Sequence, residues 1–203
     1  MNEYKIKFIQ KRDRKMDKKN ELLAAAKEVF AEKGYKAAGI SDIAKRSQMA
    51  VGSFYKYYES KEAIFLEVYV AENSRIREGI MQRVDWQGEP EAIVEQLFAV
   101  TFELISPNKI LAEWNKPGIS QILHDYYNQD SGRASNVFHQ FLIQTFSQRL
   151  QEEGFSKEKI AEIMKVYDLI YYIDMHVTEQ EFSGYFDSLE TLVKYFVKGI
   201  FSK

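Results

Sequence analysis

The chain has 203 residues, enough for one large domain or for a small domain followed by a larger one. Hydrophobic residues make up 45%, but no run of about eighteen apolar residues occurs, which argues against a membrane span. The absence of cysteine excludes disulfides and thiolate zinc sites, and the N-terminus lacks the apolar core of a signal peptide. We therefore expect a soluble, cytoplasmic protein.

The net charge of −2 conceals two parts of opposite sign. Residues 1–61 hold fifteen Lys and Arg against eight Asp and Glu, whereas the remainder holds 13 basic and 22 acidic residues. A basic head on an acidic body suits a protein that brings only its head to a polyanion. The alternative is a surface accident, but the boundary falls at the end of a motif described below.

Residues 1–19 are the most basic stretch, with eight Lys and Arg against three acidic residues. Such an arm can follow the phosphate backbone or enter the minor groove of DNA. It can also be a frayed, solvated extension, as chain termini often are. A few apolar residues near its start would let part of it pack, so these interpretations stay open.

Apolar residues at helical spacing predict a first helix over about 17–33, which Gly34 ends as a left-handed cap. A short helix then follows Gly39, residues 47–49 make a turn, and a second short helix runs over about 50–58. The expected core of these three helices is Leu22, Ala26, Phe30, Ile40, Ile43, Phe54 and Tyr58. Two short helices joined by a tight turn are a helix-turn-helix arrangement.

The same stretch resembles a known family signature. The matching positions are Gly34-Tyr35, Ile40, Ile43-Ala44, Gly52-Ser53-Phe54-Tyr55, Tyr57-Tyr58 and Ser60-Lys61-Glu62. They are similar to the tetracycline-repressor (TetR) family of bacterial regulators, over the N-terminal third only. The resemblance implies a DNA-binding repressor that works as a dimer. Gln48 stands where the family usually has the turn glycine, a position that favours positive φ.

The outward face of the second short helix is the expected DNA-reading surface. We predict DNA contacts from Val51, Ser53, Tyr55, Lys56, Tyr57 and Lys61. Val51 suits a thymine methyl, and Lys61 at the start of the next helix suits a phosphate. These residues define a DNA-binding domain over 1–61 and leave 62–203 as a helical ligand-binding and dimerisation domain.

The rest of the chain also predicts helices and no strands. Ser60 caps a connector helix over 61–84, and further helices follow over 91–105, 109–127 (with a break at Pro117-Gly118), 137–153, 157–177 (capped by Ser156) and 182–201. The fold class is therefore all-α, with an N-terminal three-helix domain and a C-terminal helical bundle.

Catalytic and metal-binding patterns find no support in the sequence. His124, His139 and His176 lie far apart, and no HExxH, CxxC or glycine-rich phosphate loop occurs. We expect no enzyme activity, no cofactor and no metal site.

Aromatic residues, 14% of the chain, are concentrated in the second part. They can simply fill the core, or they can line a hollow bundle that holds a small apolar or cationic molecule. The candidate ligand-binding residues are Phe98, Phe102, Glu113, Trp114, Tyr127, Phe146, Tyr171 and Asp174. Asp174 lies on an apolar helical face and needs a partner, which can be a basic side chain, a tyrosine hydroxyl, a second subunit or a ligand.

The last two helices carry wide apolar faces, including Leu189, Leu192 and Phe196, which would pack as a four-helix interface in a homodimer or against their own domain. We therefore predict a dimeric, ligand-responsive regulator of a palindromic operator, more in keeping with a repressor. The alternatives are an architectural DNA-binding protein without effector, and an apolar-ligand carrier whose head no longer binds DNA.

Overall fold

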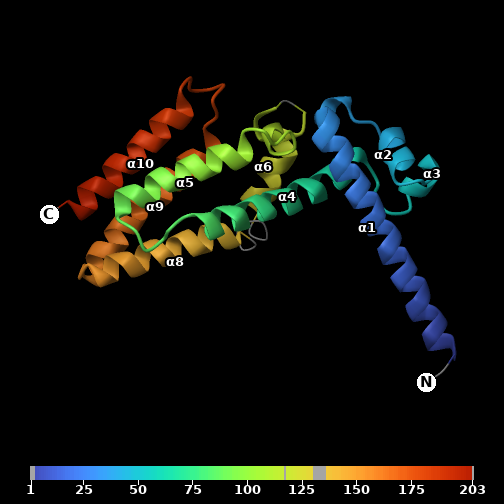
Figure 1. Cartoon of the computed structure of the whole chain (residues 1–203), viewed down its shortest axis with the longest axis horizontal. Helices are drawn as coiled ribbons and strands as arrows, with labels where there is room; N and C mark the ends of the chain where they lie inside the picture. Colours follow the sequence, from blue (N-terminus) through green and yellow to red (C-terminus); the bar gives the residue numbers. More distant parts are fainter. Residues whose placement is uncertain (1–2, 117, 130–135, 203) are drawn as a thin grey trace. The chain divides into compact units, whose positions relative to one another are not determined.

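The computed structural model describes residues 3–116, 118–129 and 136–202, and these residues form helices and turns without any strand (Figure 1). The helices are α1 (Glu3–Ala37), α2 (Ile40–Arg46), α3 (Val51–Phe54), α4 (Lys61–Arg83), α5 (Pro90–Ile105), the 3-10 helix η1 (Leu111–Asn115), α6 (Ser120–Asn128), α8 (Val137–Glu152), α9 (Lys157–His176) and α10 (Tyr185–Phe201). The all-α prediction is confirmed. Within these ranges, no helix has the length and apolar character to cross a bilayer.

The helices form two compact units. The first contains residues 1–75 and 107–125, and the second contains residues 76–106 and 126–203. The units do not divide at residue 61, because the first turns of α4 and the later segment 107–125 complete the first unit. The chain therefore passes from one unit to the other within α4, after α5 and within α6. The functional division at residue 61 stays a prediction.

The first unit is built around α1, which is longer than predicted. It begins at Glu3 instead of near residue 17, so the basic N-terminal stretch is helical and extends away from α2 and α3 (Figure 1). Gly34 interrupts the helix with φ 74° and ψ 172°, a conformation that only glycine adopts readily. The expected core is confirmed apart from Ile40, which is half-buried: Leu22, Ala26, Phe30, Ile43, Phe54 and Tyr58. Whether the N-terminal turns contact DNA stays a prediction.

The connections agree with the predicted caps. Ser60 Oγ accepts the N–H of Ala63 at 3.1 Å before α4, and Ser156 Oγ accepts that of Lys159 at 3.2 Å before α9. The predicted break in the 109–127 helix is present, because η1 and α6 are separate and Gly118 has a φ of 106°. Pro117, to which that break was assigned, and residues 130–135 lie outside the described part of the chain.

The second unit packs α5 along α10 and α8 against α9 (Figure 1). Trp86 lies beside α8, with its ring edge-on to Phe141 at 4.9 Å and its Nε1 donating to the Met81 carbonyl at 2.8 Å. Asn136 caps α8 by accepting the N–H of His139 at 3.1 Å. These contacts fix the beginning of α8, which carries part of the polar cluster described below.

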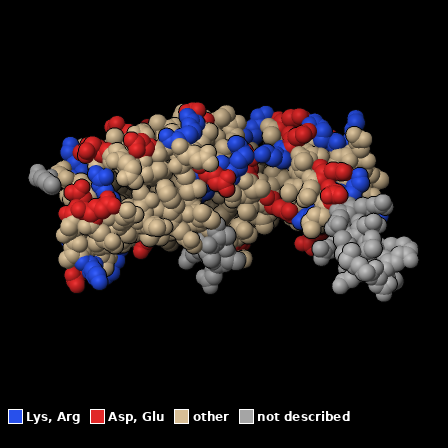
Figure 2. Space-filling view, turned by 60° about the horizontal axis from the view of Figure 1, so that its bottom comes forward, with Lys and Arg blue, Asp and Glu red and all other residues tan. Residues whose placement is uncertain are grey.

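Apolar side chains remain exposed on α9 and α10. On α9 these are Val166, Leu169 and Tyr172, and on α10 they are Leu192 and Tyr195. Figure 2 shows extended areas without charged side chains on the second unit. Of the three α10 residues predicted at an interface, Leu192 alone is exposed, because Leu189 and Phe196 turn toward the unit's own core.

Candidate nucleic-acid interface and effector site

The turn between α2 and α3 contains one residue with positive φ. The N–H of Met49 donates to the Ala44 carbonyl at 2.8 Å, which closes the turn. Gln48 adopts φ 57°, so a non-glycine residue takes the left-handed conformation expected there. At the other end of α2, the Gly39 N–H donates to the Asp42 carboxylate at 3.1 Å, which confirms Gly39 as the cap residue.

The second short helix ends earlier than predicted. α3 covers the four residues Val51–Phe54 instead of continuing to Tyr58. The next N–H groups still bond to the carbonyls of Ser53 and Phe54, so the chain continues as a tight turn. Phe54 is fully buried, and the Tyr58 hydroxyl donates to Glu67 at 3.0 Å. Together these contacts hold the turn against the first unit's core.

The side chains predicted to read DNA from α3 lie at the surface. Val51, Tyr55 and Lys56 are exposed, and Ser53 and Tyr57 are half-buried. This face offers an apolar contact for a thymine methyl, hydroxyls for hydrogen bonds, and an ammonium for phosphate. Contact with DNA itself stays a prediction for all five residues.

Lys61 is different, because its ammonium already has partners within the chain. It donates to the carbonyls of Tyr35 at 2.9 Å and Ala38 at 3.0 Å, and it lies 4.2 Å from the centre of the Tyr35 ring. An ammonium has three donors, so two of them tie the end of α1 to the start of α4. The phosphate contact stays a prediction, and the sequence did not indicate this structural role.

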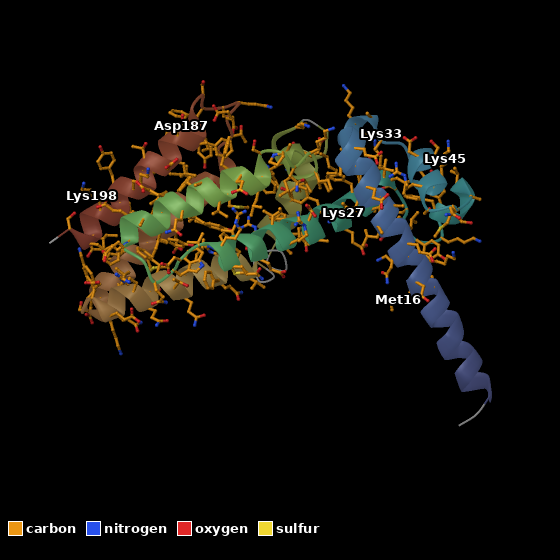
Figure 3. All side chains as sticks on the ribbon, in the orientation of Figure 1. Met16, Lys27, Lys33, Lys45, Asp187 and Lys198 are labelled. Atoms are coloured by element: carbon orange, nitrogen blue, oxygen red, sulfur yellow. The ribbon has the colours of Figure 1, made fainter. Side chains whose placement is uncertain are left out.

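Two further lysines are candidates that sequence reasoning missed. Lys36 and Lys45 are exposed and, within the described residues, form no hydrogen bond or ion pair; Lys45, on α2, is labelled in Figure 3. In contrast, Arg46 is held by Glu28 at 2.8 Å and by Glu32. The charge excess of the head indicated basic partners for DNA, but it did not show which cations were already paired.

Tyr35 is the anchor of the first unit. Its N–H donates to Glu113 Oε1 at 3.1 Å, and its hydroxyl donates to Glu62 at 2.5 Å. Burial raises the pKa of the Tyr35 hydroxyl, and the bond to Glu62 adds to this effect. Glu113 is 3% exposed and also accepts from Lys116 at 3.2 Å. The prediction that Glu113 lines a ligand site is therefore corrected: its carboxylate binds the chain end of α1.

A second buried carboxylate binds the segment 107–125 to α1 and α4. Glu72 accepts from Arg75 at 2.7 Å, from Lys27 at 2.7 Å and from Asn108 at 2.8 Å. The hydrogen bond from Arg75 contributes most to lowering its pKa, to about 2, against the opposing effect of burial. This cluster, like Tyr35, belongs wholly to the first unit.

Trp114 also packs inside the first unit. Its ring stacks on Tyr69 at 6.2 Å and lies 4.3 Å from the ring of His124, whose Nε2 is buried without a hydrogen-bond partner among the described residues. The eight predicted ligand-binding residues are thus divided: Glu113 and Trp114 lie in the first unit and the other six in the second.

In the second unit, His139 of α8 is stacked on tyrosines of α9. Its ring lies 3.7 Å from Tyr171 at an interplanar angle of 18°, and its Nδ1 is 3.2 Å from the Tyr167 hydroxyl, within hydrogen-bond distance. The Tyr171 hydroxyl accepts from Asn136 at 2.9 Å. Burial lowers the pKa of His139, with a smaller opposing effect of Asp168, so its neutral form is favoured near pH 7.

Asp174 lies one turn beyond Tyr171 on the same inward face of α9. The Tyr185 hydroxyl donates to its Oδ1 at 3.3 Å. Its side chain keeps exposed surface, yet the protein atoms around it raise the carboxyl pKa, against smaller opposing effects of Arg77 and Tyr185. Arg77 comes from α4 and lies over the Phe138 ring at 5.2 Å. The structure thus gathers polar groups from α4, α8, α9 and α10 around Asp174.

The remaining predicted ligand-binding residues have varied surroundings. Phe146 packs against Tyr167 and Phe196, each at 6.0 Å between ring centres. Tyr127 is buried and Phe98 is half-buried, whereas Phe102 is 74% exposed. Tyr171 and Asp174 share the cluster around His139, and Phe146 adjoins it through Tyr167. No group of three His, Asp or Glu side chains in the described ranges is placed to hold a metal ion.

Comparisons with known proteins support the interpretation of the N-terminal part. Residues 22–68 match the family described as "Bacterial regulatory proteins, tetR family". The HTH-type transcriptional regulator QacR of Staphylococcus aureus is 29% identical over 119 residues, 57% of this chain and 59% of that protein. The chain thus covers less than two thirds of the length of the first curated relatives that it matches.

Two solved structures share the fold over most of the chain. A protein described as a TetR-family transcriptional regulator from Mesorhizobium loti covers 91% of this chain and 95% of its own, with a TM-score of 0.53 and 21% identity. A TetR-like transcriptional regulator from Rhodococcus sp. RHA1 covers 92% and 97%, with a TM-score of 0.51 and 18% identity. At these identities the likeness concerns the fold alone.

Proposed function

Because this chain belongs to the TetR family of bacterial regulatory proteins, we propose that it represses transcription from a palindromic operator as a homodimer until a small molecule releases it. The observation that carries this proposal is the helix-turn-helix. α3 is held from below by buried Phe54 and presents exposed polar, aromatic and basic side chains. Such a face can enter the major groove and read base edges.

The homodimer part of the proposal rests on the exposed face of α9 and α10. Val166, Leu169 and Tyr172 follow one another at helical spacing on α9, and Leu192 and Tyr195 do so on α10. A second copy would bury these apolar side chains by a two-fold contact of the same surfaces. Two heads related in this way suit two half-sites about 34–36 Å apart.

Release by an effector requires that the ligand bind a state with lower DNA affinity more tightly. The second unit holds the polar cluster around Asp174, and the chain joins it to the first unit at three places, including the continuous helix α4. The segment 107–125 leaves the second unit in sequence and ends beside Tyr35, close to the start of α2. This path supports a ligand-responsive regulator over a purely architectural protein.

The test is titration of the full-length protein with DNA from upstream of its own coding sequence, against scrambled DNA of equal length, over a series of salt concentrations. We expect tighter binding to the upstream DNA, a steep loss of affinity with salt, and a complex with two protein chains. Equal affinity for both DNAs at every salt concentration would contradict the regulator and favour a sequence-independent DNA-binding protein. Absence of DNA binding would favour the carrier alternative.

A further inference from the structure

Asp174 is a carboxylate without a cationic partner. It lies on the inward face of α9 with Tyr167 and Tyr171, but its side chain keeps exposed surface. Its one hydrogen bond comes from the Tyr185 hydroxyl at 3.3 Å, and no Lys or Arg of the described residues forms an ion pair with it. A carboxylate closely surrounded by protein normally has a counter-charge, because the lost hydration must be replaced.

The charged groups around Asp174 leave an excess of negative charge. Arg77 of α4 is the nearby cation, and its guanidinium lies over the Phe138 ring, outside ion-pair distance of the carboxylate. Asp168, on α9 itself, adds a second carboxylate that acts on His139 and Tyr167. His139 favours its neutral form, and the tyrosine hydroxyls are neutral near pH 7. With both carboxylates ionised, the cluster has a formal charge of −1.

We propose that Asp174 binds the positively charged group of an aromatic organic cation, such as a protonated amine or an amidinium. The inference rests on the proposed function, since that cation would be the effector. An ammonium beside Asp174 would supply the missing counter-charge and donate to the lone pairs that Tyr185 leaves unused. Tyr167, Tyr171 and Tyr185 provide ring faces and edges around it, which favour a cation.

Neutral and anionic ligands fit this surface less well. A neutral ligand leaves the carboxylate without a counter-charge, and an anion adds a further negative charge beside Asp174 and Asp168. Arg77 is the one feature that would attract an anion, and it already acts on His139, Tyr167 and Asp174. The balance of charge therefore favours a cation.

The experiment compares three probes that share one aromatic ring: the aminomethyl, hydroxymethyl and carboxylate derivatives of anthracene. Their affinities for the full-length protein are measured by isothermal titration calorimetry near neutral pH. We expect the ammonium probe to bind about tenfold more tightly than the alcohol, and the carboxylate probe to bind most weakly. Asp174→Asn should remove the difference between ammonium and alcohol. Asp187→Asn, which removes an exposed carboxylate from the first turn of α10, should preserve it.

Tyr185→Phe provides a second test if Asp174→Asn does not fold. It removes the single hydrogen bond and keeps the carboxylate, so the preference for the ammonium probe should persist. Equal affinities for ammonium and alcohol in the unmodified protein, or a preference that survives Asp174→Asn, would overturn the inference. DNA binding is measured separately without probe: its loss would defeat the proposed function, whereas intact DNA binding with no cation preference would defeat this inference alone.

Discussion

The Glu113 carboxylate of η1 accepts the backbone N–H of Tyr35, which lies 78 residues earlier, at 3.1 Å. Gly34 makes this contact possible, because its positive φ breaks α1 and frees the N–H of Tyr35 from the helix ladder. A Cβ at Gly34 would stand 3.1 Å from the same Glu113 oxygen. The segment 107–125 is thus bound to the residues that lead directly into the helix-turn-helix.

Gly34→Ala should destabilise the protein more than Gly154→Ala. Both glycines have positive φ, but a Cβ meets no atom within 4 Å at Gly154 and meets Glu113 at Gly34. We expect a loss of about 1 kcal/mol at Gly154 and about 2–3 kcal/mol at Gly34, measured by urea denaturation. Equal losses would show that Glu113 moves away without cost.

Glu72 should make stability fall in acid. Its folded pKa of about 2 lies below the ordinary 4.5, so its stabilising effect is complete above pH 4.5 and disappears as pH falls to about 2. For a carboxylate that is 4% exposed, this difference corresponds to about 3 kcal/mol. Glu72→Gln should remove this part of the pH dependence in chemical unfolding between pH 2 and 5, whereas exposed Glu78→Gln should leave it unchanged.

Lys56 and Lys61 should respond differently to replacement by alanine. Lys56 is exposed without printed partners, so Lys56→Ala should lower DNA affinity, reduce the salt slope by about one and leave stability unchanged. Lys61→Ala removes the donors from the Tyr35 and Ala38 carbonyls, so it should also lower the melting temperature. A Lys61→Ala protein with unchanged melting temperature would contradict its structural role.

Leu192→Glu and Leu189→Glu should separate assembly from folding. Leu192 is 43% exposed on α10, so a charge there should give folded monomers that bind a palindromic site poorly. Leu189 is 7% exposed inside the unit, so the same charge should unfold it. Light scattering and circular dichroism measure the two effects. A dimeric Leu192→Glu protein would exclude this face as the interface.

Asp174→Asn should stabilise the protein near neutral pH. The folded pKa of Asp174 is raised, so the ionised carboxylate costs stability once pH rises above the unfolded value, and increasingly so up to the folded value. The asparagine variant should therefore melt at a higher temperature at pH 7, with the gain disappearing below about pH 4. A gain that persists in acid would point to a cause other than the charge.

The sequence predicted what depends on local signals. Ser60 and Ser156 cap helices as expected, Gly34 has positive φ, and Phe54 is buried beneath the DNA-facing side chains. These features follow from residue type and spacing within a few positions.

Contacts between distant segments could not be predicted in this way. No local pattern places Glu113 beside Tyr35, and no charge count shows that Lys61 binds carbonyls. The predicted ligand site therefore combined residues of two units, although the polar cluster around Asp174 contains two of its members. His139 and Tyr185, its other members, look like ordinary core residues in the sequence.

The chain has two tryptophans, and each unit contains one of them: Trp114 in the first and Trp86 in the second. Replacing either by phenylalanine leaves a single intrinsic fluorophore, so the emission of each variant reports the state of one unit. Trp114 lies against His124, whose imidazolium would quench its emission in acid, whereas Trp86 stacks edge-on against uncharged Phe141. A DNA titration followed by one variant and an effector titration followed by the other would therefore reveal, without any attached dye, whether a signal that begins in one unit reaches the other.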